Sequence, residues 1–291
     1  MSDFSTMLGL VRANLLESGA RYAKVTTTTA GATDGTTIFS ANLVENDDAW
    51  NRCDCTILSG ASAILIGTTK KVEDFQATTN KLFFTNNPFV AQVPNGATIE
   101  LTEPAVWTGQ DLKKYIEQAA NWFLRQANDL NANYAVQETI AGTAGLVNLP
   151  ANILKFMEPF VSVSNIPVTI IEPDEADWFN DPYRNSNSQY IGYFLGRASS
   201  STAIGRLRYH PTNNVNFVFN FVPRASFDVN GTWSVPEEAW DMIAMLATGI
   251  ALIANESQNL AANWLQLAVA HLPKQKDLLK AFGQLRTRAE V

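Results

Sequence analysis

The sequence has few of the residues on which most enzyme chemistry depends. It contains two cysteines and two histidines, and charged residues make up only 17% of the chain, against the roughly 25% usual in soluble domains. His210 and His271 lie far apart, without the serine, cysteine or carboxylate spacing of a nucleophile elbow or triad. Phosphate-binding loops, dinucleotide-binding turns and zinc motifs are missing too. We therefore expect no enzyme, no cofactor and no metal site.

The two cysteines, Cys53 and Cys55, are separated by one residue. This spacing in a strand places both side chains on one face, where an unstrained disulfide is disfavoured, and no histidine is nearby to complete a zinc site. We expect two small buried core residues.

Clusters of positive charge and long apolar segments are also missing. The formal net charge is -7, and no stretch gathers enough lysine or arginine to follow a phosphate backbone, so tight nucleic-acid binding is not expected. The N-terminus does not resemble a signal peptide, which predicts synthesis in the cytoplasm. The longest apolar run, residues 239–254, contains Asp241 and predicts a buried helix rather than a membrane span.

Two acidic clusters and seven tryptophans are the remaining candidates for binding sites. The clusters, residues 45–48 and 172–181, lack the spacing of a calcium loop, so we interpret them as solvated loops. A pair of carboxylates that cleaves a glycosidic bond is placed by the fold rather than by sequence spacing, so that alternative stays open. Among the tryptophans, Trp178 is the strongest candidate for an interface anchor.

The first third of the chain changes from helical to β periodicity. Residues 4–17 place Met7, Leu8, Val11 and Leu15 at helical spacing. Short β-branched and aromatic runs follow, separated by Gly, Asn, Asp and Pro, which is typical of a small all-β barrel or sandwich. These runs are residues 24–29, 36–39, 55–58, 63–66, 70–75, 81–85 and 97–101.

The rest of the chain alternates between helical and β patterns. Thr108 and Asp111 form a capping box before a predicted helix that reaches Asn131. The predicted buried stripe of this helix is Leu112, Ile116, Ala119, Phe123, Ala127 and Leu130. An antiparallel sheet is expected between two helical regions. Its runs are residues 147–150, 156–163, 168–171, 189–195, 206–209 and 216–222. A second capping box, Ser234 to Glu237, begins a helix whose buried stripe is Trp240, Ile243, Ala247, Ile250 and Ala254.

We therefore predict an α+β protein: a helical body with an antiparallel sheet and an inserted small all-β barrel or sandwich. The predicted boundaries are residues 1–21 and 103–272 for the body, 22–102 for the β-module and 273–291 for a basic tail. The tail repeats leucine and phenylalanine at helical spacing among basic residues, so we expect it to dock on a partner. Its candidate docking residues are Lys274, Lys276, Leu278, Leu279, Lys280, Phe282, Leu285, Arg286 and Arg288.

At this point the second half resembles the adaptor, or head–tail connector, proteins of tailed phages, over about residues 104–270. The resemblance rests on an alanine-rich helix at 111–131 and on segments that follow it in order. These segments are LPANILKF at 149–156, QYIGY at 189–193, RLRYHP at 206–211, FVFNFV at 217–222, VPEEAW at 235–240 and IAMLATG at 243–249.

The β-module is similar to a small β-domain that recurs in virion proteins of tailed bacteriophages. The matching segments are ENDDAW at 45–50, TILSG at 56–60, KKVEDF at 70–75, LFFT at 82–85 and GATIEL at 96–101. Its position between the first and second helices departs from the pattern of the adaptor family.

The resemblance implies a structural protein of the virion neck. It would form a homo-oligomeric ring, a dodecamer matching the portal, and would bind the portal protein and a tail or nozzle protein. A tail fibre or collar protein is a further expected partner, and DNA would pass through the ejection channel without specific binding. Three alternatives stay open: a decoration or fibre-attachment protein working through the β-module, a glycan-cleaving enzyme, and a binding module unrelated to phages.

Overall fold

Two separate sets of apolar residues organise the chain, and each gives one compact unit. The computed structural model describes residues 3–15, 22–104, 106–126, 136–150, 152–163, 166–170, 191–195, 206–210, 214–233, 235, 237–255, 257 and 260–270. The first unit contains residues 1–123 and 225–282, and the second contains residues 124–224 and 283–291. These boundaries differ from the predicted ones, since the β-module and the helices belong to one unit and the later strands form another.

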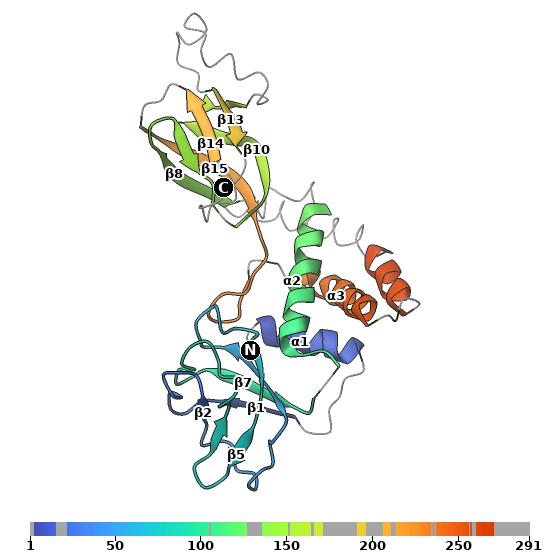
Figure 1. Ribbon diagram of the computed structural model, residues 1–291. Helices are drawn as coiled ribbons and strands as arrows, with labels where there is room; N and C mark the ends of the chain where they lie inside the picture. The colour runs from blue at the N-terminus through green and yellow to red at the C-terminus, as the bar shows by residue number, and fades with distance from the viewer. Residues whose placement is uncertain are drawn as a thin grey trace, which may run out of the picture. The chain divides into compact units, whose positions relative to one another are not determined.

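The first unit combines helices with the predicted β-module (Figure 1). Its helical elements are α1 (Asp3–Asn14), α2 (Gly109–Gln126, whose last turn enters the second unit), the 3-10 turn η3 (Glu237–Ala239), α3 (Trp240–Ala254) and a helix over 260–270. Its strands are β1 (Tyr22–Thr26), β2 (Thr37–Phe39), β3 (Asp54–Ser59), β4 (Thr69–Lys71), β5 (Asp74–Gln76), β6 (Lys81–Phe83) and β7 (Thr98–Thr102).

The β-module consists of two open sheets. One has the strand order β1-β7-β3-β4 and the other the order β2-β6-β5, and all strand pairs in both are antiparallel. Within the described residues no sheet closes into a barrel, so the barrel alternative of the prediction is wrong. Residues 63–66, predicted as a strand, form a turn instead. Leu65 and Ile66 are buried there, and Gly67 adopts φ +76°, which ends the extended backbone.

The helices of the first unit follow the predicted periodicity closely at α1 and α2. α1 buries Phe4, Met7, Leu8 and Val11 and packs against α3 and β3. α2 buries the predicted stripe from Leu112 to Phe123 and begins at the predicted capping box. The Thr108 hydroxyl accepts a hydrogen bond from the Asp111 backbone N–H at 3.1 Å, and the Asp111 carboxylate accepts one from the Thr108 backbone N–H at 3.3 Å. These reciprocal bonds satisfy amides that the first turn leaves open. The Thr108 hydroxyl also donates to the Asp111 carboxylate at 2.7 Å.

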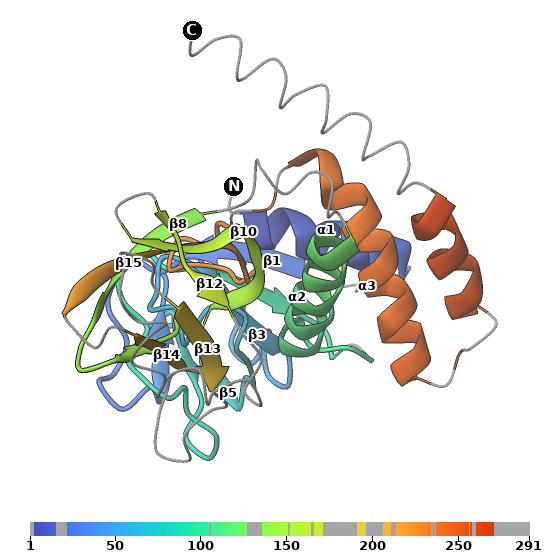
Figure 2. The same cartoon turned by 90° about the horizontal axis from the view of Figure 1, so that it is seen from above.

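α3 differs from its prediction in both its cap and its buried face. Ala239 is its N-cap and makes no side-chain capping bond, and Ser234 of the predicted box lies outside the described residues. The buried side chains extend around most of the helix, whereas Ala254 of the predicted stripe is exposed. The reason is that α3 packs against α1 and also against the helix over 260–270, which lies beside it in Figure 2.

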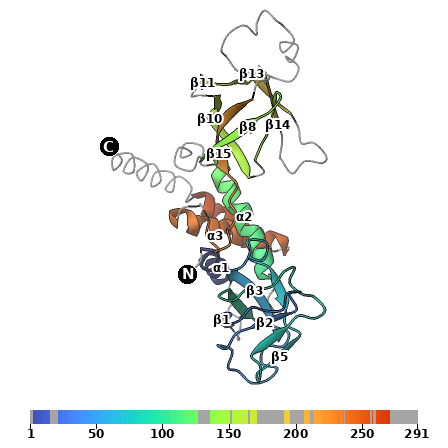
Figure 3. The ribbon, with the colours of Figure 1, turned by 90° about the vertical axis from the view of Figure 1, so that its left-hand side faces the viewer.

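The second unit is a β-sandwich of two four-stranded sheets (Figure 3). Its strands are β8 (Val136–Gly142), β9 (Leu146–Asn148), β10 (Ile153–Val163), β11 (Ile166–Pro167), β12 (Thr169–Ile170), β13 (Ile191–Leu195), β14 (Arg206–His210) and β15 (Val215–Pro223). The sheet orders are β11-β10-β15-β8 and β12-β13-β14-β9. The prediction of a single antiparallel sheet is therefore corrected: there are two sheets, and the β12–β13 pair is parallel.

One apolar core fills the space between these two sheets. Tyr209 of β14 meets Phe217 of β15 edge-on, with ring centroids 4.5 Å apart. Phe156 of β10 stacks on Phe194 of β13 at 5.0 Å. Since each pair joins one sheet to the other, burial of these rings holds the sandwich together.

Candidate interaction surface

The described residues contain no arrangement typical of a catalytic or metal centre. No group of three histidine, cysteine, aspartate or glutamate side chains in this part of the chain could hold a metal ion. His210 ends β14, and His271 lies outside the described residues. No helix in the described part combines the length and apolar character needed to cross a membrane.

The acidic cluster at residues 45–48 stabilises a turn. Glu45 accepts a hydrogen bond from the indole N–H of Trp50 at 3.0 Å, and Asp47 accepts one from the backbone N–H of Ala77 at 2.7 Å. The side chain of Trp50 is only 5% exposed. These carboxylates therefore organise the β-module, whereas the second acidic cluster, at residues 172–181, lies outside the described residues.

The two cysteines are buried, as predicted. Burial raises the pKa of the Cys55 thiol well above its ordinary value, and the negative charges of Glu100 and Asp54 raise it further. Because the thiolate is the reactive form, a thiol in this position is a poor nucleophile.

A buried ion pair joins α1 to the β-module. Arg12 Nη1 lies 2.9 Å from Glu100 Oε2 on β7, and the two side chains are only 10% and 6% exposed. Burial raises the pKa of Glu100, while the charge of Arg12, a hydrogen bond with Tyr22 and the charge of Lys24 act in the opposite direction. Arg12 Nε is buried without a hydrogen-bond partner. This pair fixes where α1 docks, because removing either partner would leave a buried charge uncompensated.

The contact residues predicted from the sequence lie in parts of the chain that the structure does not describe. Trp178 and the docking residues of the tail, Lys274 to Arg288, lie outside the described residues. They stay predictions. Sequence reasoning did not single out the surface that the structure offers instead, on the helix over 260–270.

That helix carries a face without any charge. We call it the uncharged helical surface and define it as Leu260, Asn263, Gln266, Leu267 and Ala270. Leu260 is 58% exposed and Leu267 is 49% exposed. Asn263, Gln266, Leu267 and Ala270 line an open hollow of about 470 Å³. Exposed leucines around a hollow are typical of a protein–protein contact.

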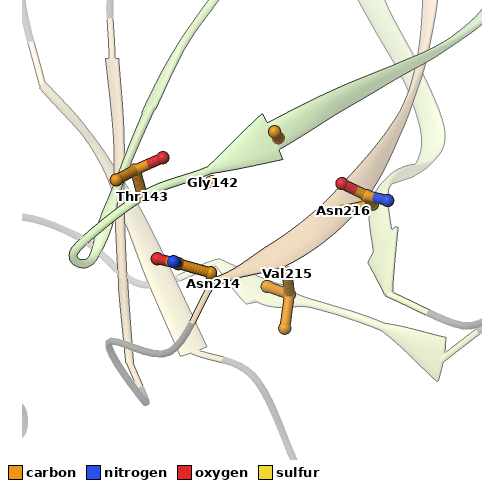
Figure 4. Close-up of a pocket in the computed structure, with 6 residues that line it drawn as sticks. Gly142, Thr143, Asn214, Val215 and Asn216 are labelled. Atoms are coloured by element: carbon orange, nitrogen blue, oxygen red, sulfur yellow. The ribbon is translucent and has the colours of Figure 1, made fainter.

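A second hollow, of about 330 Å³, lies in the sandwich where β8 ends beside the start of β15 (Figure 4). Thr143, Asn214 and Asn216 supply its polar groups, all of them neutral. A residue larger than glycine does not fit at position 142, which lines this hollow. A Cβ there would lie 2.6 Å from the Tyr209 hydroxyl oxygen and 2.7 Å from Phe217 Cε2. The lining offers hydrogen bonds but no acid, base or aromatic platform, so it is a weaker candidate than the uncharged helical surface.

Comparisons with known families and curated sequences give no family assignment. No protein-family model matches the chain, and no curated protein sequence matches it.

Proposed function

We propose that the protein is a structural subunit of a bacteriophage neck. In this role it forms a dodecameric adaptor ring that connects the portal to the tail and lines the channel through which DNA is ejected. It is made in the host cytoplasm, becomes part of the virion and has no enzymatic activity.

The observation that carries this proposal is the order of elements in which the family-like segments fall. Described parts of these segments lie on α2, β10, β13, β14, β15 and α3, in that order. A helix, a β region and a second helix in this sequence match what the resemblance implies for an adaptor body.

Charge and composition support the same role. With a net charge of -7, the chain repels DNA on average, which suits a channel wall past which DNA must slide. A surface with few charges also costs little to desolvate when permanent contacts form.

The basic tail is the part we assign to portal binding. Its positive charge is opposite to that of the rest of the chain, and its leucines and phenylalanine repeat at helical spacing. Removing residues 274–291 should abolish binding to the portal protein encoded by the same genome. If the shortened chain binds the portal as tightly as the full chain, this assignment is wrong.

A decoration or fibre-attachment protein is the second candidate, and the β-module favours it. Three of its apolar side chains are strongly exposed: Val44 at 82%, Val90 at 68% and Ile64 at 67%. In that role the β-module would bind a peripheral partner such as a tail fibre or collar protein.

Electron microscopy separates the two candidates. The full-length protein is mixed with purified portal, and the complexes are imaged in negative stain. The adaptor proposal predicts a ring coaxial with the portal. Density at the periphery favours the second candidate, and a chain that does not bind the portal contradicts the adaptor proposal.

A further inference from the structure

The helix over 260–270 already uses one of its faces within the chain. Ala261 and Ala268 are buried, and Leu265 packs onto Gly249 of α3. A Cβ at Gly249 would lie 2.7 Å from Leu265 Cδ2, so glycine lets the two helices approach closely. The helical repeat places the uncharged helical surface on the opposite side, away from α3.

The lack of charge extends well beyond that surface. None of residues 242–255, 257 and 260–270 is charged, so most of α3 and the whole neighbouring helix are uncharged on a strongly acidic chain. The charged residues nearest to them in the sequence are Asp241, in the first turn of α3, and Glu256. Covering exposed leucines there removes apolar area from water at no cost in buried charge.

The charge pattern indicates which partner fits. A basic protein or a nucleic acid would not be selected by a face that carries no negative or positive groups. Two copies of this chain, each with a net charge of -7, repel one another except where the meeting surfaces carry no charge. Asn263 and Gln266 both donate and accept hydrogen bonds, so they can pair with polar groups of a neighbour without an oppositely charged partner.

We propose that the uncharged helical surface is a contact between two copies of this chain, with the hollow beside Leu267 receiving an apolar side chain of the neighbour. This rests on the proposed function for its setting, since adjacent subunits of a ring must touch.

The test uses the purified full-length protein. Sedimentation is measured over a series of protein concentrations for the wild type, for Leu267→Glu and for Val229→Glu. Both replaced side chains are about half exposed, Leu267 at 49% and Val229 at 47%, so folding should be retained. Leu267→Glu should weaken self-association by about tenfold or more, whereas Val229→Glu should match the wild type.

Cross-linking identifies the partner directly. A photoreactive benzoylphenylalanine replaces Leu267 in chains grown with heavy isotopes, and these are mixed with light chains before illumination. Heavy–light cross-links support the proposal. A wild type that stays monomeric at every concentration, or cross-links only within one chain, overturns it.

The two proposals fail in different ways. If Leu267→Glu still forms a coaxial ring on the portal as readily as the wild type, the contact is wrong and the adaptor function stands. If the wild type self-associates through Leu267 but forms no ring, the adaptor function is wrong and the contact stands.

Discussion

Both units of the chain have an apolar core, but they differ in the polar contacts that accompany it. In the sandwich, the core between the sheets is made of aliphatic side chains, phenylalanines and Tyr209. In the first unit, polar contacts join segments that are distant in sequence. Arg12 pairs with Glu100, Asn121 accepts a hydrogen bond from the backbone N–H of Ala225 at 2.9 Å, and Asp3 accepts one from that of Trp233 at 3.2 Å.

The apolar contacts and the polar contacts differ in how strictly they depend on particular side chains. A sandwich core tolerates exchange of one apolar residue for another of similar size. The docking of α1, in contrast, depends on particular partners, since a buried charge without its counterpart is costly. In the sandwich, we expect a large loss of stability when a buried side chain is shortened. In the first unit, we expect a loss of stability that a second substitution, at the partner residue, reverses.

The largest effect is expected from Phe217→Ala. Phe217 is fully buried and contacts Tyr209 and Phe219, so the change should lower the free energy of unfolding by about 4 kcal/mol. Hydrogen exchange measured by mass spectrometry should show lost protection confined to β8–β15. Gln137→Ala on the exposed part of β8 is the control. Equal loss of protection from exchange in both units would show that the two units do not lose stability independently.

Breaking the ion pair should have the next largest effect. Arg12→Met leaves the Glu100 carboxylate without its partner and should destabilise the first unit by about 3 kcal/mol. Adding Glu100→Leu should recover most of that loss, because the pair is then replaced by apolar groups. Urea denaturation of the single and double variants measures both. A double variant less stable than Arg12→Met would show that the pair does more than fix the docking of α1.

A smaller effect is expected at the start of α2. Thr108→Ala removes the two hydrogen bonds of the hydroxyl, including the one from the Asp111 backbone N–H, and should cost about 1 kcal/mol. Thr108→Ser keeps the hydroxyl and should stay close to the wild type in thermal unfolding. Equal losses in the two variants would mean that the methyl group, and not the cap, matters there.

The smallest effect is expected in the pH dependence of stability. Burial raises the pKa of Glu100 above its ordinary value, so between the two values the folded chain binds more protons than the unfolded chain. The contribution of Glu100 to stability is therefore present at low pH and declines as the pH rises through that window. The free energy of unfolding of the wild type and of Glu100→Gln is measured as a function of pH across this range. If the two free energies change with pH in parallel, folding does not raise the pKa of Glu100.

The elements that could be predicted from the sequence are those that a short local pattern determines. The capping box at Thr108, the stripe of α2 and the burial of the cysteines each follow from a few residues at a regular spacing. The strands β14 and β15 were also found, because β15 is rich in phenylalanine and valine and β14 alternates arginine with leucine and tyrosine.

The failures lie where tertiary packing decides the outcome. The apolar residues 63–66 form a turn that buries Leu65 and Ile66 within the same module. β8 was missed because most of its residues are exposed and three of the seven are polar, and its pairing with β15 over seven residues makes it a strand. A pattern of strands likewise does not say whether they form one sheet or two. The sequence alone also does not show that Leu260 and Leu267 are exposed, because that depends on which side of their helix packs against α3.

Cryo-electron microscopy of the intact particle neck would show whether this chain forms the proposed adaptor ring. We expect density for the chain as a closed ring between portal and tail, coaxial with the DNA channel and sharing the symmetry of the portal. Density for the chain only on the outside of the particle, or no density for it in the neck, would show that it is not the adaptor.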